Sequence, residues 1–210
     1  MLRNCLSYDD VLLVPQYSEI ASRSDIDIST DLGRGVKLFL PVIASPMDTI
    51  SEASMGIAMQ RSGGSAIIHR YNTIEEQVHE IKIIQSLYNG NWEDLMVGAA
   101  VGVSGDYLDR ATALYDAGAS FICIDIAHGH HILMKGALAK LKEIFGDNIH
   151  IMAGNIATLQ GINDLADWGA DSVRCNIGGG SICSTRIQTG HGVPGLQTIL
   201  DCAQTDRDVK

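Results

Sequence analysis

The sequence contains no apolar run of the roughly 18 residues that a membrane-spanning helix needs, and its N-terminus lacks the charged-then-apolar layout of a signal peptide. Charged residues make up only 19% of the 210, too few for a disordered chain or a charged coiled coil. Basic residues are scarce: 15 Lys and Arg stand against 25 Asp and Glu, and a net charge of −10 argues against nucleic acid as the main partner. We expect a soluble, cytoplasmic protein that binds neither membranes nor nucleic acid, although glycine-rich loops could still bind a nucleotide phosphate through backbone N–H groups.

The cysteines number five, include no CxxC pair and are widely spaced, which excludes a disulfide framework and a zinc site. Cys123 and Cys175 lie in apolar runs and are predicted to be buried structural thiols, because free cysteine is among the most buried residue types. Cys183 lies among glycines and hydroxyl residues instead. Cys183 is therefore the candidate for a reactive cysteine.

Short runs rich in Ile and Val alternate with amphipathic stretches from residue 39 onward. The runs show no polar alternation, which is typical of parallel strands buried on both faces. They are Phe39–Ala44, Ser65–His69, Leu95–Val101, Ser120–Ala127, His150–Ala153 and Asp171–Ile177.

The stretches between these runs carry helix start and stop signals. Thr49–Glu52 and Thr73–Glu76 both match a Thr-x-x-Glu capping box. Glycines stand where the helices should end, since glycine takes up the left-handed geometry there without strain; they are Gly63, Gly118, Gly146 and Gly169. The pattern predicts repeated strand–helix units and an α/β fold.

Two architectures fit such units, an open doubly wound sheet and a (β/α)8 TIM barrel. The loops with chemical character all follow strands, which favours a barrel whose site is built at the carboxyl ends of its strands. Only six units are found, whereas a complete barrel has eight strands and typically about 250 residues. We therefore predict a barrel truncated after about six βα units over residues 39–210, with two unpaired strand edges, and an irregular lead-in over residues 1–38 that packs on it.

The segment Gly178–Arg186 is the strongest local signal for a site. Its glycines let the backbone approach a ligand and direct N–H groups at an anion, and Ser181 adds a hydroxyl donor. Thr185 could act on water or a leaving group, and Arg186 could favour the thiolate of Cys183. The alternative is a flexible glycine turn that carries an incidental cysteine.

Four segments, in this order along the chain, resemble the signature motifs of the IMP dehydrogenase/GMP reductase family. They are Tyr8–Pro15, Ala44–Thr49, Ala153–Thr158 and Gly180–Arg186 with Thr189–Pro194. The resemblance implies that the Cys183 thiolate attacks C2 of a purine nucleotide. In the dehydrogenase, hydride leaves C2 for NAD and water hydrolyses the thioimidate, which converts IMP to XMP. In the reductase, NADPH converts GMP to IMP and ammonia is released.

The resemblance also implies roles for individual residues. Cys183 and Thr185 are the catalytic pair, and Thr185 helps to activate the water or leaving group. The nucleotide positions are Ser45, Met47, Asn155 and Ser181, of which Ser181 is a phosphate ligand. Asp125 lies near the nicotinamide ribose. The backbone carbonyls of Gly178, Gly180 and Cys183 bind a monovalent cation, usually K⁺, and the family forms homotetramers.

The chain departs from the family pattern at several points. Gly179 stands where proline is usual and Asn176 where glycine is usual, so a positive φ at residue 176 would disturb the cation loop. Ser184 replaces a threonine. The family's second phosphate loop, its ribose-binding aspartate and the flap with the general base have no counterpart in the 210 residues. A non-catalytic fragment is therefore one of the alternatives.

Within the family, Ser45–Thr49 and Ser181–Cys183 are closer to the dehydrogenase. The inserted CBS modules of most dehydrogenases are missing, because the second helix leads through Asn89–Trp92 directly to the third strand, as in reductases and some short dehydrogenases. We expect an IMP dehydrogenase-like enzyme using NAD, with a GMP reductase using NADPH as the alternative. The histidines His128, His130 and His131 are expected to line the cofactor site rather than to bind metal, and His69–Arg70 to form a pocket wall or a structural support.

Overall fold

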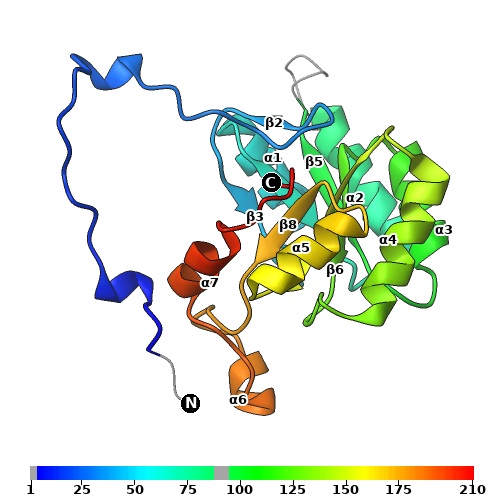
Figure 1. Ribbon diagram of the computed structural model, residues 1–210. Helices are drawn as coiled ribbons and strands as arrows, with labels where there is room; N and C mark the ends of the chain where they lie inside the picture. The colour runs from blue at the N-terminus through cyan, green and yellow to red at the C-terminus, as the bar shows by residue number, and fades with distance from the viewer. Residues whose placement is uncertain (1–3, 88–94) are drawn as a thin grey trace.

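The computed structural model describes residues 4–87 and 95–210, so the Asn89–Trp92 connection lies outside the described residues. In the described part, six parallel strands form one curved sheet in chain order, and helices cover its outer face (Figure 1). The strands are β3 (Ile43–Ala44), β4 (Ser65–Ile68), β5 (Val97–Val101), β6 (Phe121–Asp125), β7 (His150–Ile156) and β8 (Ser172–Cys175). The predicted α/β fold is confirmed, and the sheet is a half barrel.

Seven α-helices are described: α1 (Ala53–Arg61), α2 (Ile74–Leu87), α3 (Tyr107–Asp116), α4 (Ile132–Phe145), α5 (Leu159–Asp167), α6 (Thr185–Thr189) and α7 (Gly195–Cys202). The capping box at Thr73 is confirmed, since its hydroxyl accepts from the Glu76 N–H at 3.2 Å and its own N–H donates to the Glu76 carboxylate at 2.9 Å. The predicted box at Thr49 is wrong. Thr49 has φ 61°, and α1 begins only at Ala53 without a side-chain cap.

The glycines predicted to end helices all have positive φ: 81° at Gly63, 87° at Gly118, 55° at Gly146 and 105° at Gly169. A side chain would strain the backbone at these positions, which explains the glycines.

Side chains alternate between two cores along each strand. In β6, Ile122 and Ile124 pack outward against the helices, whereas Phe121 and Cys123 point into the barrel. The inner core also contains Val36, Ile67, Ala100 and Met152. Both faces of the sheet are buried, which is why the strand sequences show no polar alternation.

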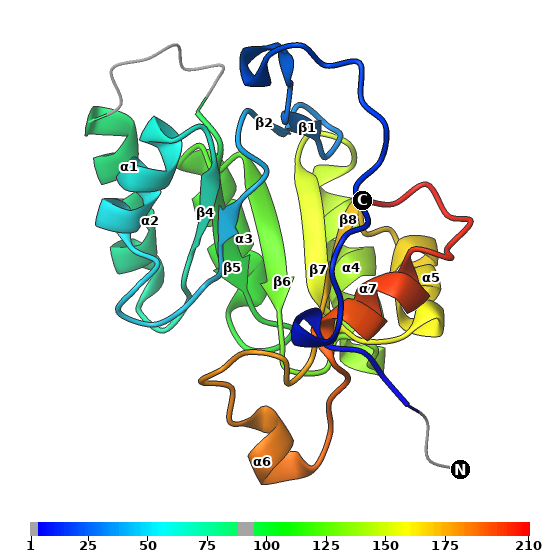
Figure 2. The same ribbon diagram turned by 90° about the vertical axis from the view of Figure 1, so that its left-hand side faces the viewer.

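A short antiparallel hairpin, β1 (Thr30–Asp31) and β2 (Lys37–Leu38), was not predicted within the lead-in. Its Val36 belongs to the inner core, and Arg34 at its turn lies 2.5 Å from the Asp171 carboxylate at the start of β8. The hairpin therefore closes the amino end of the half barrel. Figure 2 shows it at the opposite end of the sheet from α6.

Residues 8–29, which we call the strap, are all exposed, including the short helices η1 (Tyr8–Asp10) and η2 (Arg23–Asp25). Leu12 is 95% and Leu13 97% exposed. Just before the strap, the Leu6 carbonyl accepts from the Gln197 N–H of α7 at 3.2 Å. The lead-in therefore contacts the barrel at its two ends (Figure 1). Tyr8, at the start of the strap, also lies beside Gly195 of α7, where a Cβ atom would approach its ring to 3.2 Å.

The free edge of β8 is not left unpaired, contrary to expectation. The Val173 N–H donates to the Lys210 carbonyl at 2.8 Å, and the Lys210 N–H donates to the Asp171 carbonyl at 3.2 Å. This is the bonding pattern of a parallel pair. Among the described helices, none has both the length and the apolarity to cross a bilayer.

Candidate functional site at the carboxyl ends of the strands

Polar side chains gather where the parallel strands end. Asp125 is the last residue of β6, Asn155 lies near the end of β7, and Arg174 lies in β8. Ser45 and Arg70 follow β3 and β4. The carboxyl ends of parallel strands meet at one edge of a sheet, so these residues from distant parts of the chain lie together.

Arg174 contacts two of the residues predicted for the site and is linked to a third through Asp125. Its Nη1 lies 2.5 Å from Asp125 Oδ1, and its Nη2 donates to the Ser45 hydroxyl at 3.4 Å. Asn155 Nδ2 donates to the same Asp125 oxygen at 3.1 Å. The Arg174 and Asp125 side chains are only 22% and 16% exposed. Sequence reasoning missed Arg174, because a charge in the middle of a strand has no local motif.

A cavity of about 380 Å³ opens beside this network. Ser45 and Asn155 both line it, together with Arg174 and Asn176, and it extends toward the amino end of the strands as far as Leu32 and Lys210. Met47 is not among its lining residues. Its carbonyl accepts from the N–H groups of Ile50 and Ser51 at 3.2 and 2.9 Å, so it shapes the turn after Ser45.

Cys183 lies in the loop between β8 and α6, which projects from the carboxyl end of the sheet (Figure 2). Hydrogen bonds from the hydroxyl and the N–H of Thr185 lower the pKa of the Cys183 thiol, and the N–H groups of Gly178 and Arg186 act in the same direction. These bonds outweigh desolvation, which opposes them. Because the thiolate is the nucleophilic form, the pairing with Thr185 favours reaction at Cys183.

The cysteines in the strands are different. Burial raises the pKa of Cys123 to about 12, and it also raises that of Cys175 to about 12. Cys123 is buried as predicted, whereas Cys175 is only half-buried. Neither forms appreciable thiolate near neutral pH, so of these three cysteines only Cys183 is suited to nucleophilic chemistry.

Replacing Thr185 by valine should slow alkylation of Cys183 at pH 7 severalfold, because the thiol loses a hydrogen bond that favours its ionised form. The pKa of Cys183 is lowered in the unchanged chain, so the midpoint of the rate–pH curve should move to higher pH in the variant. Iodoacetamide labelling followed by peptide mass spectrometry measures this curve. Thr185→Ser keeps the hydroxyl and should leave the midpoint in place; identical curves for the valine variant and the unchanged chain would contradict the role of Thr185.

The Cys183 loop and the Arg174 network remain separate. In the part of the chain that the structure describes, no hydrogen bond or ion pair joins Gly178–Thr185 to Ser45, Asp125 or Asn155. Ser181 is exposed. A second cavity of about 600 Å³ lies beside the base of this loop, and Asn176 lines both cavities. The predicted site residues therefore form two groups that meet at Asn176.

The two departures at residues 176 and 179 are in contact. A Cβ atom on Gly179 would lie 2.5 Å from Nδ2 of Asn176, so a side chain at residue 179 would displace the Asn176 amide. Asn176 is not among the described residues with positive φ, so its own backbone is not strained. Gly178 has φ 81°, and carbonyl oxygens are suitable ligands for K⁺. The loop thus fits a monovalent cation chemically, although the Gly180 carbonyl already accepts from the Cys183 N–H at 3.1 Å.

The ambiguous histidines have structural partners. His69 is buried and lies 3.3 Å from the Glu52 carboxylate, so it supports the start of α1. His130 pairs with Asp164 of α5 at 2.6 Å, and Nδ1 of His131 accepts from the Leu133 N–H to cap α4. The residue after His69 is Arg70, whose Nη2 donates to the Asp125 carbonyl at 3.3 Å.

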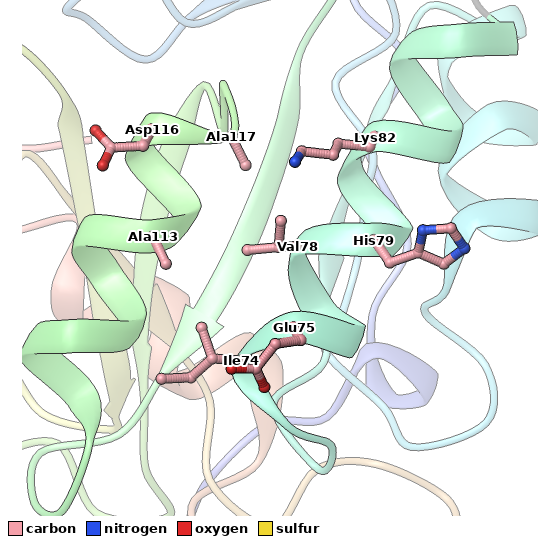
Figure 3. Close-up of a pocket in the computed structure, with 8 residues that line it drawn as sticks. All are labelled: Ile74, Glu75, Val78, His79, Lys82, Ala113, Asp116 and Ala117. Atoms are coloured by element: carbon pink, nitrogen blue, oxygen red, sulfur yellow. The ribbon is translucent and has the colours of Figure 1, made fainter.

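A groove of about 540 Å³ lies on the outer face of the molecule, between α2 and α3 (Figure 3). Val78 and Ala113 form its floor, and the charged side chains of Glu75, Lys82 and Asp116 form its rim. It lies behind the sheet, away from the strand ends, and takes no part in the site.

Comparison with known proteins matches residues 5–210 to the IMP dehydrogenase / GMP reductase domain. The inosine-5′-monophosphate dehydrogenase of Nitrosopumilus maritimus (strain SCM1) is 31% identical over 97% of this chain and 67% of its own length. That of Cryptosporidium parvum is 34% identical over 94% and 58%. The GMP reductase of Leishmania major is 29% identical over 95% and 66%. The chain thus spans about three fifths to two thirds of the length of these relatives.

The match to the Nitrosopumilus protein extends over 321 aligned positions, more than the 210 residues here. That relative therefore carries residues within the matched region that have no counterpart in this chain. The predicted absence of CBS modules after α2 stays a prediction, because residues 88–94 lie outside the described part.

Proposed function

Because this chain belongs to the IMP dehydrogenase/GMP reductase family, we propose that it captures a purine nucleotide through Cys183 and that its reaction is that of an IMP dehydrogenase. The observation that carries the proposal is the hydrogen bonding between Cys183 and Thr185, which lowers the pKa of the thiol. A second support is the cluster of Ser45, Asn155 and Asp125 around Arg174 at the carboxyl ends of the strands.

In this proposal the Cys183 sulfur forms a bond to C2 of IMP, and the hydride on C2 leaves to NAD. The thioimidate left on Cys183 is then hydrolysed: water adds at C2, the carbon–sulfur bond breaks, and XMP is released while the sulfur regains its thiolate form. Thr185 assists the transfer of the water proton, and Ser181 binds the nucleotide phosphate. Ser45 and Asn155 line the base pocket, Met47 holds the turn that follows Ser45, and Asp125 binds the nicotinamide ribose. K⁺ held by the carbonyls of Gly178, Gly180 and Cys183 would fix the loop.

A purine 5′-monophosphate with an electrophilic C2 substituent should add to Cys183 and to no other cysteine. The reason is that only Cys183 combines a lowered thiol pKa with a position on a glycine-rich phosphate loop. Intact-mass and peptide mass spectrometry should show one adduct on the Cys183 peptide and none in Cys183→Ala. Labelling of Cys123 or Cys175 in place of Cys183 would refute the proposal.

The dehydrogenase is favoured over the reductase by the Ser45–Thr49 motif and by the Ser181–Cys183 segment. Formation of NADH with IMP, against consumption of NADPH with GMP, distinguishes the two reactions by absorbance of the reduced cofactor.

A non-catalytic nucleotide-binding chain is the second candidate. It is favoured by the separation of the Cys183 loop from the Arg174 network and by the exposure of Leu12 and Leu13 on the strap. Exposed apolar segments favour association between chains, so we also propose that the protein forms homo-oligomers. Adduct formation at Cys183 without turnover in a self-associated chain would identify this candidate.

A further inference from the structure

Two cysteines that the proposed reaction does not use meet in the outer core. Cys175 is the last residue of β8, and Cys202 is the last residue of α7, the helix that packs on this strand (Figure 1). Cys202 and Thr198 are the buried residues of α7, and Cys175 packs against the same core cluster as Cys202. Both cysteines are free. One contact between a strand and a helix thus holds two thiols that lie far apart in the sequence.

The two thiols interact directly. The Cys175 and Cys202 side chains hydrogen-bond to each other, and this bond acts on the pKa of both. Cys175 also donates to the Val173 carbonyl at 3.7 Å. A disulfide requires two cysteines whose side chains face each other, because a pair that points apart is joined only if the backbone moves. The packing of α7 on β8 supplies this arrangement.

The two thiols differ in exposure. Cys175 is half-buried and is among the residues that line the cavity of about 380 Å³ beside the Arg174 network, whereas Cys202 is only 3% exposed. Burial raises the pKa of both thiols, that of Cys175 to about 12. The thiolate fraction is therefore small near neutral pH, and exchange with an external disulfide is slow but rises with pH. Cys175 is the sulfur that a small molecule reaches first.

A bond between these cysteines would join the two ends of the segment that carries Cys183. Cys175 directly precedes this segment, and α7 follows it. Its two arms are already in register at one point, where the Val193 N–H donates to the Ile177 carbonyl at 3.1 Å. A disulfide stabilises a fold by restricting the loop that it closes in the unfolded chain. Here the closed loop would contain all of residues 176–201.

We propose that Cys175 and Cys202 form a reversible disulfide, with a small-molecule disulfide such as oxidised glutathione as the oxidant. Cys175 attacks one sulfur of the oxidant and the first glutathione thiol leaves. Cys202 then attacks the Cys175 sulfur of the mixed disulfide, the protein disulfide forms, and the second glutathione thiol leaves. Two electrons pass from the protein sulfurs to the oxidant, and the two protein thiol protons leave with the products. The competing interpretation is that the two thiols are only neighbours in a packed core.

Incubation of the full chain in glutathione redox buffers, with alkylation of the remaining thiols and peptide mass spectrometry, separates these interpretations. In a tryptic digest Cys175 and Cys183 share one peptide and Cys202 lies in the next, so Cys183→Ala is used to make the assignment unique. This variant should give a Cys175 peptide joined to the Cys202 peptide. The initial rate should rise roughly tenfold per pH unit between pH 7 and 9, because each unit below a thiol's pKa multiplies its thiolate fraction tenfold.

Cys123 is the internal control. Burial raises its pKa to about 12 as well, but its sulfur lies 3.9 Å from Nη1 of Arg174 and has no hydrogen bond to a cysteine among the described residues, so it should stay reduced. The cross-linked chain should melt roughly 5–10 °C above the reduced chain. Adding Cys202→Ala should abolish the cross-link and this shift, whereas adding Cys5→Ser should change neither.

Three results would overturn the proposal in favour of simple packing. They are Cys175 trapped only as a mixed disulfide with glutathione, a cross-link that forms only in urea, and a cross-linked chain that melts no higher than the reduced one. If the Cys202→Ala chain does not fold, the cross-linked peptide decides alone, since it is measured with both cysteines in place. The nucleotide adduct on Cys183 tests the proposed function separately, because it requires neither Cys175 nor Cys202.

Discussion

Replacing Gly98 by alanine should lower the free energy of unfolding by about 3 kcal/mol, at the upper end of the usual cost of overpacking a core. Gly98 lies in β5, directly paired with Phe121 of β6. A Cβ atom at this position would lie 2.2 Å from the Phe121 ring, a separation that no real contact allows. Both residues face the inside of the half barrel, where the ring is fully buried and has little room to shift.

The matched control is Gly136→Ala in α4, where the same added carbon meets nothing within 4 Å. Alanine is favoured over glycine in helices by about 0.5–1 kcal/mol, so this variant should be slightly stabilised. Urea unfolding followed by circular dichroism measures both changes. The melting temperature of Gly98→Ala should fall by roughly 6–12 °C. Equal midpoints for the two variants would show that the inner core is looser than the structure indicates.

Replacing Asp125 by alanine should cost about 2–3 kcal/mol of stability, because it leaves the Arg174 guanidinium without its partner inside the half barrel. The two groups are separated by 2.5 Å and are largely shielded from water. Burial alone would disfavour the charge on Arg174, and Asp125 is among the negative groups that keep its pKa raised. Chemical denaturation of the single variants gives the cost directly.

The double variant Asp125→Ala/Arg174→Met tests the cause. Methionine fills similar space without a charge, so the double variant should recover most of the stability that Asp125→Ala loses. Asp125→Asn should lie between the two, since the amide keeps a hydrogen-bonding oxygen. A double variant as unstable as Asp125→Ala would mean that the carboxylate acts through Asn155, whose Nδ2 lies 3.1 Å from it, rather than through Arg174.

The strands could be predicted because burial on both faces selects an unbroken apolar run, a signal contained within each segment. The capping-box pattern predicted the start of a helix correctly at one of its two positions. Thr73 and Thr49 share the same local pattern, but Thr49 lies in a turn in which the Met47 carbonyl accepts from Ser51, so the helix starts later. The β1–β2 hairpin was missed because its strands are two residues long and are held by the inner core rather than by their own sequence.

The site residues also divide into those that a local motif reveals and those whose role depends on contacts between distant segments. Cys183 and Thr185 are two residues apart, so their motif is local and their pairing could be expected. The role of Arg174 depends on the register that places β8 beside β7 and so brings the guanidinium to Asp125, 49 residues earlier. That of Arg70 depends on a carbonyl 55 residues away. Contacts of this kind are created by the sheet and leave no trace in a single segment.

The anchoring of the lead-in has a consequence for the order of folding. Leu6 is bonded to Gln197, a separation of 191 residues in the chain. Closing such a long loop has a large entropic cost before any contact compensates for it. During synthesis the β–α units can assemble one after another as they emerge, but the N-terminal residues have no docking site until α7 exists. The first residues to be made should therefore be the last to settle on the barrel.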